Sequence, residues 1–200
     1  MTPFMALDHL PTSRQYYRFP LPISTVIPYV SQLADAFDYA HSQYVCPSYI
    51  APETILIGHH GEALLAGFGM ALLYMLQDRE GFDKRWELLV PLCYLSPEQL
   101  GGGPMGPFSD QYALAAVVYE WLCGMPPFHG TSSMQTAAQI ITTPPPPLRE
   151  KAPKLPLALE QVIMKALAKK PEERFATIQA FSHALREASQ RAVDGPTQPT

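Results

Sequence analysis

The sequence predicts a mainly α-helical domain with one small β-hairpin. Apolar residues between positions 26 and 40 recur at spacings of three and four, which is the pattern of a helix with one buried face. The run Ala113–Val118 is apolar at every position, which is typical of a helix buried on all sides. Two short apolar runs, Ile55–Ile57 and Ala63–Ala66, flank the turn sequence Gly58-His59-His60-Gly61 and indicate the hairpin.

Length and composition limit the class of protein. The chain has 200 residues, 47% of them hydrophobic and 16% charged, which is enough apolar surface for one compact domain. The net charge of -4 argues against nucleic acid or an anionic membrane as a partner. The longest uncharged apolar run, Ala63–Leu76, is shorter than the ~20 residues of a membrane-spanning helix. Cys46, Cys93 and Cys123 cannot all pair and lie far apart, so we expect a reducing, cytoplasmic location.

The N-terminal half divides into three predicted parts besides the hairpin. Residues 1–22 contain prolines and aromatic residues and form an irregular lead-in. A helix follows from a cap at Ser24 or Thr25 to about residue 42, and Pro28 is tolerated because it lies near the first turn. No period holds from residue 70 to residue 95, so we expect an irregular but partly buried segment there.

The C-terminal half contains four predicted helices. The first begins at Ser109 or Asp110 and ends before Gly124, a residue type that commonly terminates helices. The other three span about 133–141, 156–169 and 177–188, with Thr177 as the cap of the last. The polar tail 189–200 is expected to be disordered, which leaves residues 23–188 as the folded domain.

Seven short blocks follow one another in a fixed order along the chain. They are 33–41 (LADAFDYAH), 52–56 (PETIL), 68–69 (FG), 94–100 (YLSPEQL), 109–114 (SDQYAL), 124–128 (GMPPF) and 165–175 (KALAKKPEERF). Together they resemble the large, C-terminal lobe of a bacterial-type serine/threonine protein kinase. The resemblance implies a kinase-like C-lobe, and the chain begins about where the hinge would be, so we expect the small N-terminal lobe to be absent.

The residues that this family needs for phosphoryl transfer are missing. Transfer requires carboxylates for magnesium, a base for the hydroxyl and a lysine for phosphate. By the resemblance, Tyr49 stands at the catalytic aspartate, Ala51 at the loop lysine, Thr54 at the metal-binding asparagine and Gly67 at the metal-binding aspartate. No shift of register restores them, because no Asp, Lys or Arg occurs from residue 39 to residue 77. We therefore expect no catalytic, cofactor-binding or metal-binding residues.

Polar residues that resemble the family's structural ones remain. Asp110 resembles the aspartate that binds backbone amides of the catalytic loop. Glu98 and Arg174 resemble a buried ion pair, and losing one partner of such a pair typically costs about 3–5 kcal/mol. The segment 70–95 contains no Ser or Thr, so a Ser/Thr phosphorylation switch has no acceptor there.

Four other patterns are better explained by structure than by chemistry. The Gly101, Gly103, Gly106 pattern lacks the preceding strand of a nucleotide-binding loop. Adjacent histidines in a turn point apart, so His59-His60 is expected at the surface without a metal. The proline run 144–147 is expected to connect two helices. A hydrolytic carboxylate pair, Glu53 and Glu62, has no other convergent group to support it.

One apolar surface suggests how the protein acts. The face around Ala63–Leu76 would meet nucleotide and the small lobe in a whole kinase, and a large uncovered apolar face usually marks an interface. We expect it to be covered by self-association, by a protein partner or by residues 70–89 of its own chain. The sequence thus predicts a catalytically inactive, kinase-like module that acts through protein contacts. Two alternatives are a truncated kinase with residual phosphotransfer or ATP binding, and a non-functional fragment that still folds.

Overall fold

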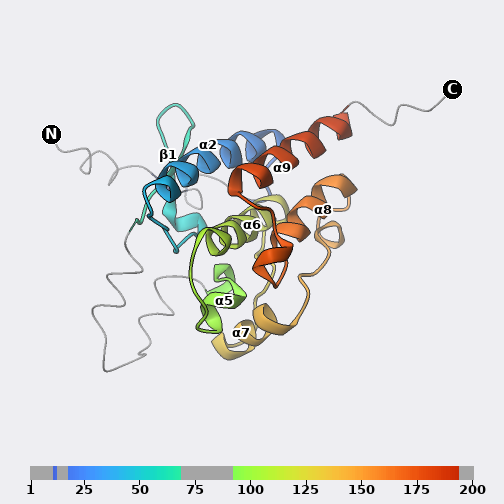
Figure 1. The fold of residues 1–200 in the computed structure, drawn as a ribbon. Helices are drawn as coiled ribbons and strands as arrows, with labels where there is room; N and C mark the ends of the chain where they lie inside the picture. Colours follow the sequence, from blue (N-terminus) through green and yellow to red (C-terminus); the bar gives the residue numbers. More distant parts are fainter. Residues whose placement is uncertain (1–10, 13–17, 69–91, 194–200) are drawn as a thin grey trace.

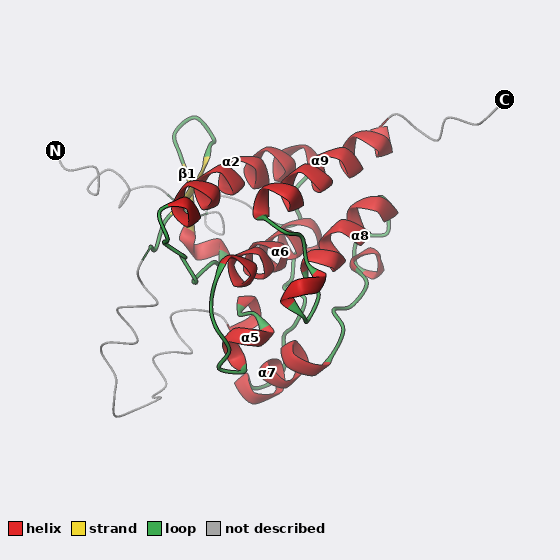
Figure 2. Ribbon diagram, in the orientation of Figure 1, coloured by secondary structure: helices red, strands yellow, loops and turns green. Residues whose placement is uncertain are grey.

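The computed structural model describes residues 11–12, 18–68 and 92–193, which form a helical domain with one two-stranded antiparallel sheet (Figures 1 and 2). The elements, in chain order, are α2 (Ile23–Ser42), η2 (Pro52–Thr54), β1 (Ile55–Ile57), β2 (Ala63–Leu65), η3 (Leu92–Tyr94), α5 (Pro97–Leu100), α6 (Pro107–Cys123), α7 (Ser133–Thr142), η4 (Leu148–Glu150), α8 (Leu157–Ala166), η5 (Pro171–Glu173) and α9 (Ile178–Val193). Within the described residues, no helix has the length and apolar character needed to cross a membrane.

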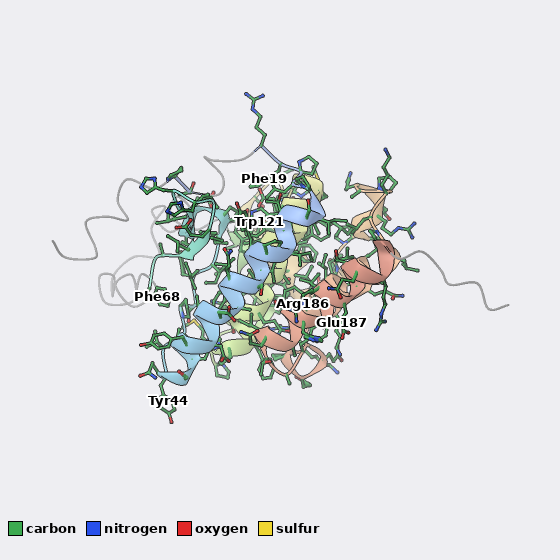
Figure 3. All side chains as sticks on the ribbon, turned by 90° about the horizontal axis from the view of Figure 1, so that it is seen from above. Phe19, Tyr44, Phe68, Trp121, Arg186 and Glu187 are labelled. Carbon is green, nitrogen blue, oxygen red and sulfur yellow. The ribbon has the colours of Figure 1, made fainter. Side chains whose placement is uncertain are left out.

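Helix α6 is the centre of the domain. Every residue from Ser109 to Leu122 is buried, as the apolar run 113–118 predicts. Helices α2 and α9 lie side by side across one side of α6, and α5 and α7 lie on the other (Figure 1). Trp121, labelled in Figure 3, lies near the end of α6. Its ring packs edge-on against Tyr29 of α2, with ring centroids 6.0 Å apart. The core is therefore built around α6.

Helix α2 has the predicted buried stripe but a different start. The apolar residues spaced along it are buried: Val26, Val30, Leu33, Phe37 and Ala40. The predicted cap at Ser24 or Thr25 is wrong, because the helix begins at Ile23 and Pro22 is its N-cap, without a side-chain bond. The Pro22 carbonyl already accepts the backbone N–H groups of Thr25 and Val26, so both predicted caps lie inside the first turn.

The hairpin forms where the sequence predicts it. Strands β1 and β2 pair antiparallel with Ile55 opposite Leu65, and residues 58–62 form the turn between them. Gly61 has φ +80°, a left-handed conformation that glycine adopts without a steric penalty. The backbone N–H of Ala63 donates to the Gln32 side chain at 2.7 Å, which ties the hairpin to α2.

Helix α6 also starts earlier than predicted. It begins at Pro107, whose missing N–H costs nothing in the first turn, and Gly106 is the N-cap. Ser109 and Asp110 are therefore not caps, and their side chains bind other segments instead. The predicted end is confirmed: Gly124 has φ +90° and donates its N–H to the Glu120 carbonyl at 2.7 Å.

The remaining helices follow the predicted order with shifted ends. Helix α8 stops at Ala166, short of the predicted residue 169, and the carbonyls just beyond it bind Arg174. The Thr177 hydroxyl accepts the Ala180 N–H at 3.0 Å and caps α9 as predicted. Helix α9 continues to Val193, so disorder from residue 189 is wrong for 189–193; residues 194–200 lie outside the described part. The glycine pattern 101–106 and the proline run 144–147 lie between helices, as expected.

Candidate functional site

The segment Pro47–Thr54, which we call the 47–54 loop, connects the end of α2 to the hairpin. Two residues of this loop, Tyr49 and Ala51, stand at the family's catalytic aspartate and loop lysine, and both are buried. Tyr49 packs with Leu95 in a small apolar cluster beside the main core. The positions that the kinase resemblance assigns to an aspartate and a lysine are thus occupied by groups that contribute to packing.

Thr54 uses its hydroxyl within its own turn. The Oγ1 atom accepts the Ala51 backbone N–H at 3.1 Å and donates to the Ala51 carbonyl at 3.0 Å. The Thr54 carbonyl accepts the Ala66 N–H at 2.8 Å, which joins the turn to the end of β2. The one hydroxyl at the magnesium positions therefore closes a 3-10 turn, and a neutral oxygen is in any case a weak magnesium ligand.

Gly67 has a backbone conformation that suits glycine. Its φ is +80°, and a residue with a Cβ atom is strained there by roughly 1–2 kcal/mol. Phe68, which follows it, is 45% exposed and lies at the edge of the described region (Figure 3). Residues 69–91, including most of the predicted irregular segment and residues 69–76 of the apolar face, lie outside the described part of the chain.

Glu62 is the acidic residue of the hairpin turn. Its carboxylate accepts the His60 backbone N–H at 3.0 Å. Its pKa is lowered, first by a hydrogen bond from its own backbone N–H, and also by the bond from His60 and the two nearby histidines. His59 and His60 are exposed, as the sequence predicts. The Glu62 carboxylate thus bonds within the turn itself, at the surface.

Asp110 holds the 47–54 loop against α6. Its carboxylate is fully buried; Oδ1 accepts the Ser48 N–H at 2.7 Å, and Oδ2 lies 2.8 Å from His41 Nε2. Ser48 has φ +58°, and its carbonyl accepts the Gln99 side-chain amide at 2.9 Å. Burial raises the pKa of Asp110, although the bonds from His41 and Ser48 oppose this. The loop is thus fixed at Ser48 by residues from α5 and α6.

Cys46 lies beside this buried carboxylate and was not a predicted site residue. Its thiol, a carboxylate oxygen of Asp110 and a ring nitrogen of His41 all lie within 4.8 Å of one another. Burial and the negative charge of Asp110 raise the pKa of Cys46, so the thiol is protonated at neutral pH and is not a preformed nucleophile. Sequence spacing alone gave no signal for this cluster, because Asp110 is far from the other two along the chain.

Arg174 forms bonds through every nitrogen of its side chain. Its guanidinium makes a bidentate ion pair with Glu98 of α5, with both N–O distances 2.8 Å. The remaining N–H groups donate to the backbone carbonyls of Phe108, Ala168 and Lys169. All five guanidinium donors therefore have acceptors, which is the condition for burying this charge without a large penalty.

The groups around Glu98 stabilise the charged form of its carboxylate. Burial raises its pKa, but the hydrogen bonds and charge of Arg174, together with the Ser109 hydroxyl at 2.8 Å, outweigh burial and leave the pKa lowered. Gln111, in the same turn of α6, exchanges two bonds with the backbone of Phe175, at 2.9 and 3.0 Å. We call the group Glu98, Ser109, Gln111 and Arg174 the Arg174 network.

Comparison with known proteins supports the kinase resemblance. The protein kinase domain family matches residues 4–185 of the chain. The serine/threonine-protein kinase PknF of Mycobacterium tuberculosis is 31% identical over 182 residues, covering 89% of this chain and 38% of that protein. The serine/threonine-protein kinase Pkn1 of Myxococcus xanthus is 35% identical over 191 residues, covering 91% of this chain and 26% of that protein. The chain therefore spans well under half the length of these relatives.

A solved structure has a similar fold. The crystal structure of the Mycobacterium tuberculosis PknI kinase domain superimposes with a TM-score of 0.66 at 26% sequence identity. The match covers 90% of this chain and 62% of that chain. The order of elements around α6 is therefore similar to that of part of a solved kinase domain.

Proposed function

This chain belongs to the protein kinase domain family, and from that premise we propose that it is a catalytically inactive, kinase-like domain that acts through protein contacts. We assign the described helices to the larger, helical lobe of such a domain. The inactive state is proposed for this chain alone; its relatives carry the names of serine/threonine-protein kinases.

One observation carries the proposal: the 47–54 loop is folded, but its side chains lack the groups for phosphoryl transfer. Tyr49 and Ala51 are buried, and the Thr54 hydroxyl is bonded within its own turn. Magnesium and a triphosphate need anionic ligands and a lysine, and these residue types do not occur at the family positions. The loop contributes to packing, and we infer that this is its remaining role.

Titration with magnesium and ATP tests the inactive state. We expect the midpoint of thermal unfolding of the purified chain to be unchanged by Mg²⁺-ATP relative to Mg²⁺ alone, because a ligand that does not bind adds no stability. Thr54→Val is the matched variant, since it removes the one hydroxyl at the magnesium positions. A Mg²⁺-dependent rise in the wild-type midpoint that Thr54→Val abolishes would favour a kinase with residual ATP binding.

The protein contacts are proposed at the face around Ala63–Leu76, and a second copy of the chain is the simplest occupant. Phe68 is the large apolar residue of this face that the structure describes as exposed. We expect light scattering to give a mass above the 22.2 kDa of one chain, and Phe68→Ser to lower it. Met134→Ser is the control, because Met134 is 83% exposed on α7 and is not one of the residues of this face. A mass of one chain for all three proteins contradicts self-association.

A further inference from the structure

Three side chains that commonly bind metals lie together behind the 47–54 loop. They are His41 in the last turn of α2, Cys46 in the segment that follows, and Asp110 in the first turn of α6. One donor atom from each lies within 4.8 Å of the other two. Among the described residues this is the one group of three such side chains, and the kinase resemblance assigns it no role in magnesium binding.

Two of the three donors are already held in position. The His41 ring packs against the buried ring of Phe37, with centroids 5.9 Å apart, and its Nε2 faces Asp110 Oδ2. The Ser48 N–H occupies Oδ1 of the same carboxylate at 2.7 Å. An ion can therefore use Oδ2 while the bond that holds the 47–54 loop stays in place.

The charge around Asp110 favours a cation. The carboxylate is fully buried, and in the part of the chain that the structure describes, His41 is the one basic side chain within ion-pair distance. The sequence supplies no Lys or Arg from residue 39 to residue 77. A buried carboxylate without a permanent positive partner is costly, and a bound divalent ion offsets that cost.

We propose that His41, Cys46 and Asp110 bind one divalent metal ion of the Zn²⁺ class. A nitrogen, sulfur and oxygen donor set suits Zn²⁺ and related transition metals, whereas Mg²⁺ prefers oxygen ligands alone. Binding releases the thiol proton of Cys46 and replaces the hydrogen bond between His41 Nε2 and Asp110 Oδ2 by bonds to the metal, with the imidazole proton on Nδ1. This site is separate from the magnesium positions at Thr54 and Gly67.

The geometry requires a small adjustment. Zn²⁺ bonds of about 2.0–2.3 Å in a tetrahedral arrangement place donor atoms roughly 3.3–3.6 Å apart. The thiol of Cys46 must approach by up to about 1 Å, and the 2.8 Å between His41 Nε2 and Asp110 Oδ2 must widen by about 0.5 Å to admit the ion. Cys46 lies outside the helices, between Tyr44 and Ser48, and the His41 side chain keeps 16% of its surface exposed. Water or a ligand from another molecule can complete the coordination from that side.

Metal titration of the purified full chain tests the site. After chelator treatment, we expect calorimetry to show one Zn²⁺ bound per chain, and Co²⁺ to produce a thiolate-to-cobalt charge-transfer absorption. Cys46→Ser is expected to weaken Zn²⁺ binding at least about 10-fold and to remove that absorption. His41→Gln, which keeps an N–H donor toward Asp110, is expected to weaken binding to a similar degree.

Two controls separate this site from other metal-binding groups. Cys123→Ser is matched, because Cys123 is also half-buried but lies at the other end of α6, about 20 Å from Asp110 along the helix. A variant with His59→Gln and His60→Gln removes the histidines of the hairpin turn. No Zn²⁺ binding, binding unchanged by Cys46→Ser, or binding lost in the turn variant would each overturn the proposal. Since no nucleotide is used, that failure is independent of the proposed function.

Discussion

The Arg174 network and the 47–54 loop both attach to the first turn of α6, but the network is built on a bidentate ion pair, whereas the loop is held by hydrogen bonds to one buried carboxylate and within its own turn. In the network, Arg174 meets a carboxylate and three backbone carbonyls. In the loop, Thr54 bonds to its own turn, and Asp110 reaches in from α6 to hold Ser48. Four consecutive residues of α6 thus bind three parts of the chain: Phe108 and Gln111 bind Arg174 and Phe175, Ser109 binds Glu98, and Asp110 binds Ser48.

The side chains that join distant segments of this fold are different from those at the family's transfer positions. The polar side chains of the Arg174 network bond to one another or to backbone groups inside the domain. The residues of this chain at the family's transfer positions are packed or bonded locally: Tyr49 and Ala51 are buried, and the Thr54 hydroxyl bonds within its own turn.

The largest expected effect is at Arg174. We expect Arg174→Met to lower the free energy of unfolding by about 3–5 kcal/mol, because Glu98 is left as an unpaired, mostly buried carboxylate. Urea denaturation measures it. The double variant Glu98→Gln, Arg174→Met is expected to recover part of the loss, since it removes the stranded charge.

Lys170 provides the control for this charge pair. It forms an exposed ion pair with Glu173 at 3.6 Å, so we expect Lys170→Ala to change stability by less than about 1 kcal/mol. If Arg174→Met costs no more than Lys170→Ala, the Arg174 network does not hold the fold.

Acid tests the same pair without a further substitution. Because the folded-state pKa of Glu98 lies below its ordinary 4.5, the stability it contributes is fully present above that pH and is lost as pH falls through the lowered value. We expect the stability difference between wild type and Arg174→Met to shrink as pH is lowered from 6 toward 3. A constant difference across that range contradicts the pairing.

Periodic apolar patterns allowed most of the fold to be predicted, and backbone capping explains where prediction failed. Helices α2 and α6 start from Pro22 and Gly106, which cap without any side-chain bond, so searching for Ser, Thr or Asp placed both starts too late. Helix α9 continues beyond its apolar stripe, where side-chain pairs four residues apart support it: Glu187, labelled in Figure 3, lies 3.4 Å from His183 and 3.8 Å from Arg191.

The sequence predicts those parts of the candidate site in which the residue type at a single position is decisive, but not those that depend on several residues meeting in space. The absence of Asp and Lys from the family's transfer positions is visible in the sequence, as are Asp110, Glu98 and Arg174 through the family resemblance. The His41–Cys46–Asp110 cluster is not, because 69 residues separate His41 from Asp110 and only the packing of α2 against α6 brings them together. Cys46 belongs to none of the seven blocks that carry the resemblance.

The smallest expected effect is in the 47–54 loop. Thr54→Val keeps the shape of the side chain but removes the hydroxyl that bonds the Ala51 N–H and carbonyl. We expect a loss of about 1 kcal/mol in the free energy of unfolding, which urea denaturation resolves. Thr142→Val is the control: that hydroxyl bonds the Ala138 carbonyl on the exposed side of α7, so we expect a change within about 0.5 kcal/mol. Equal effects of the two variants would mean that the Thr54 hydroxyl does not stabilise the fold. The 47–54 loop would then not be held by the bonds within its turn.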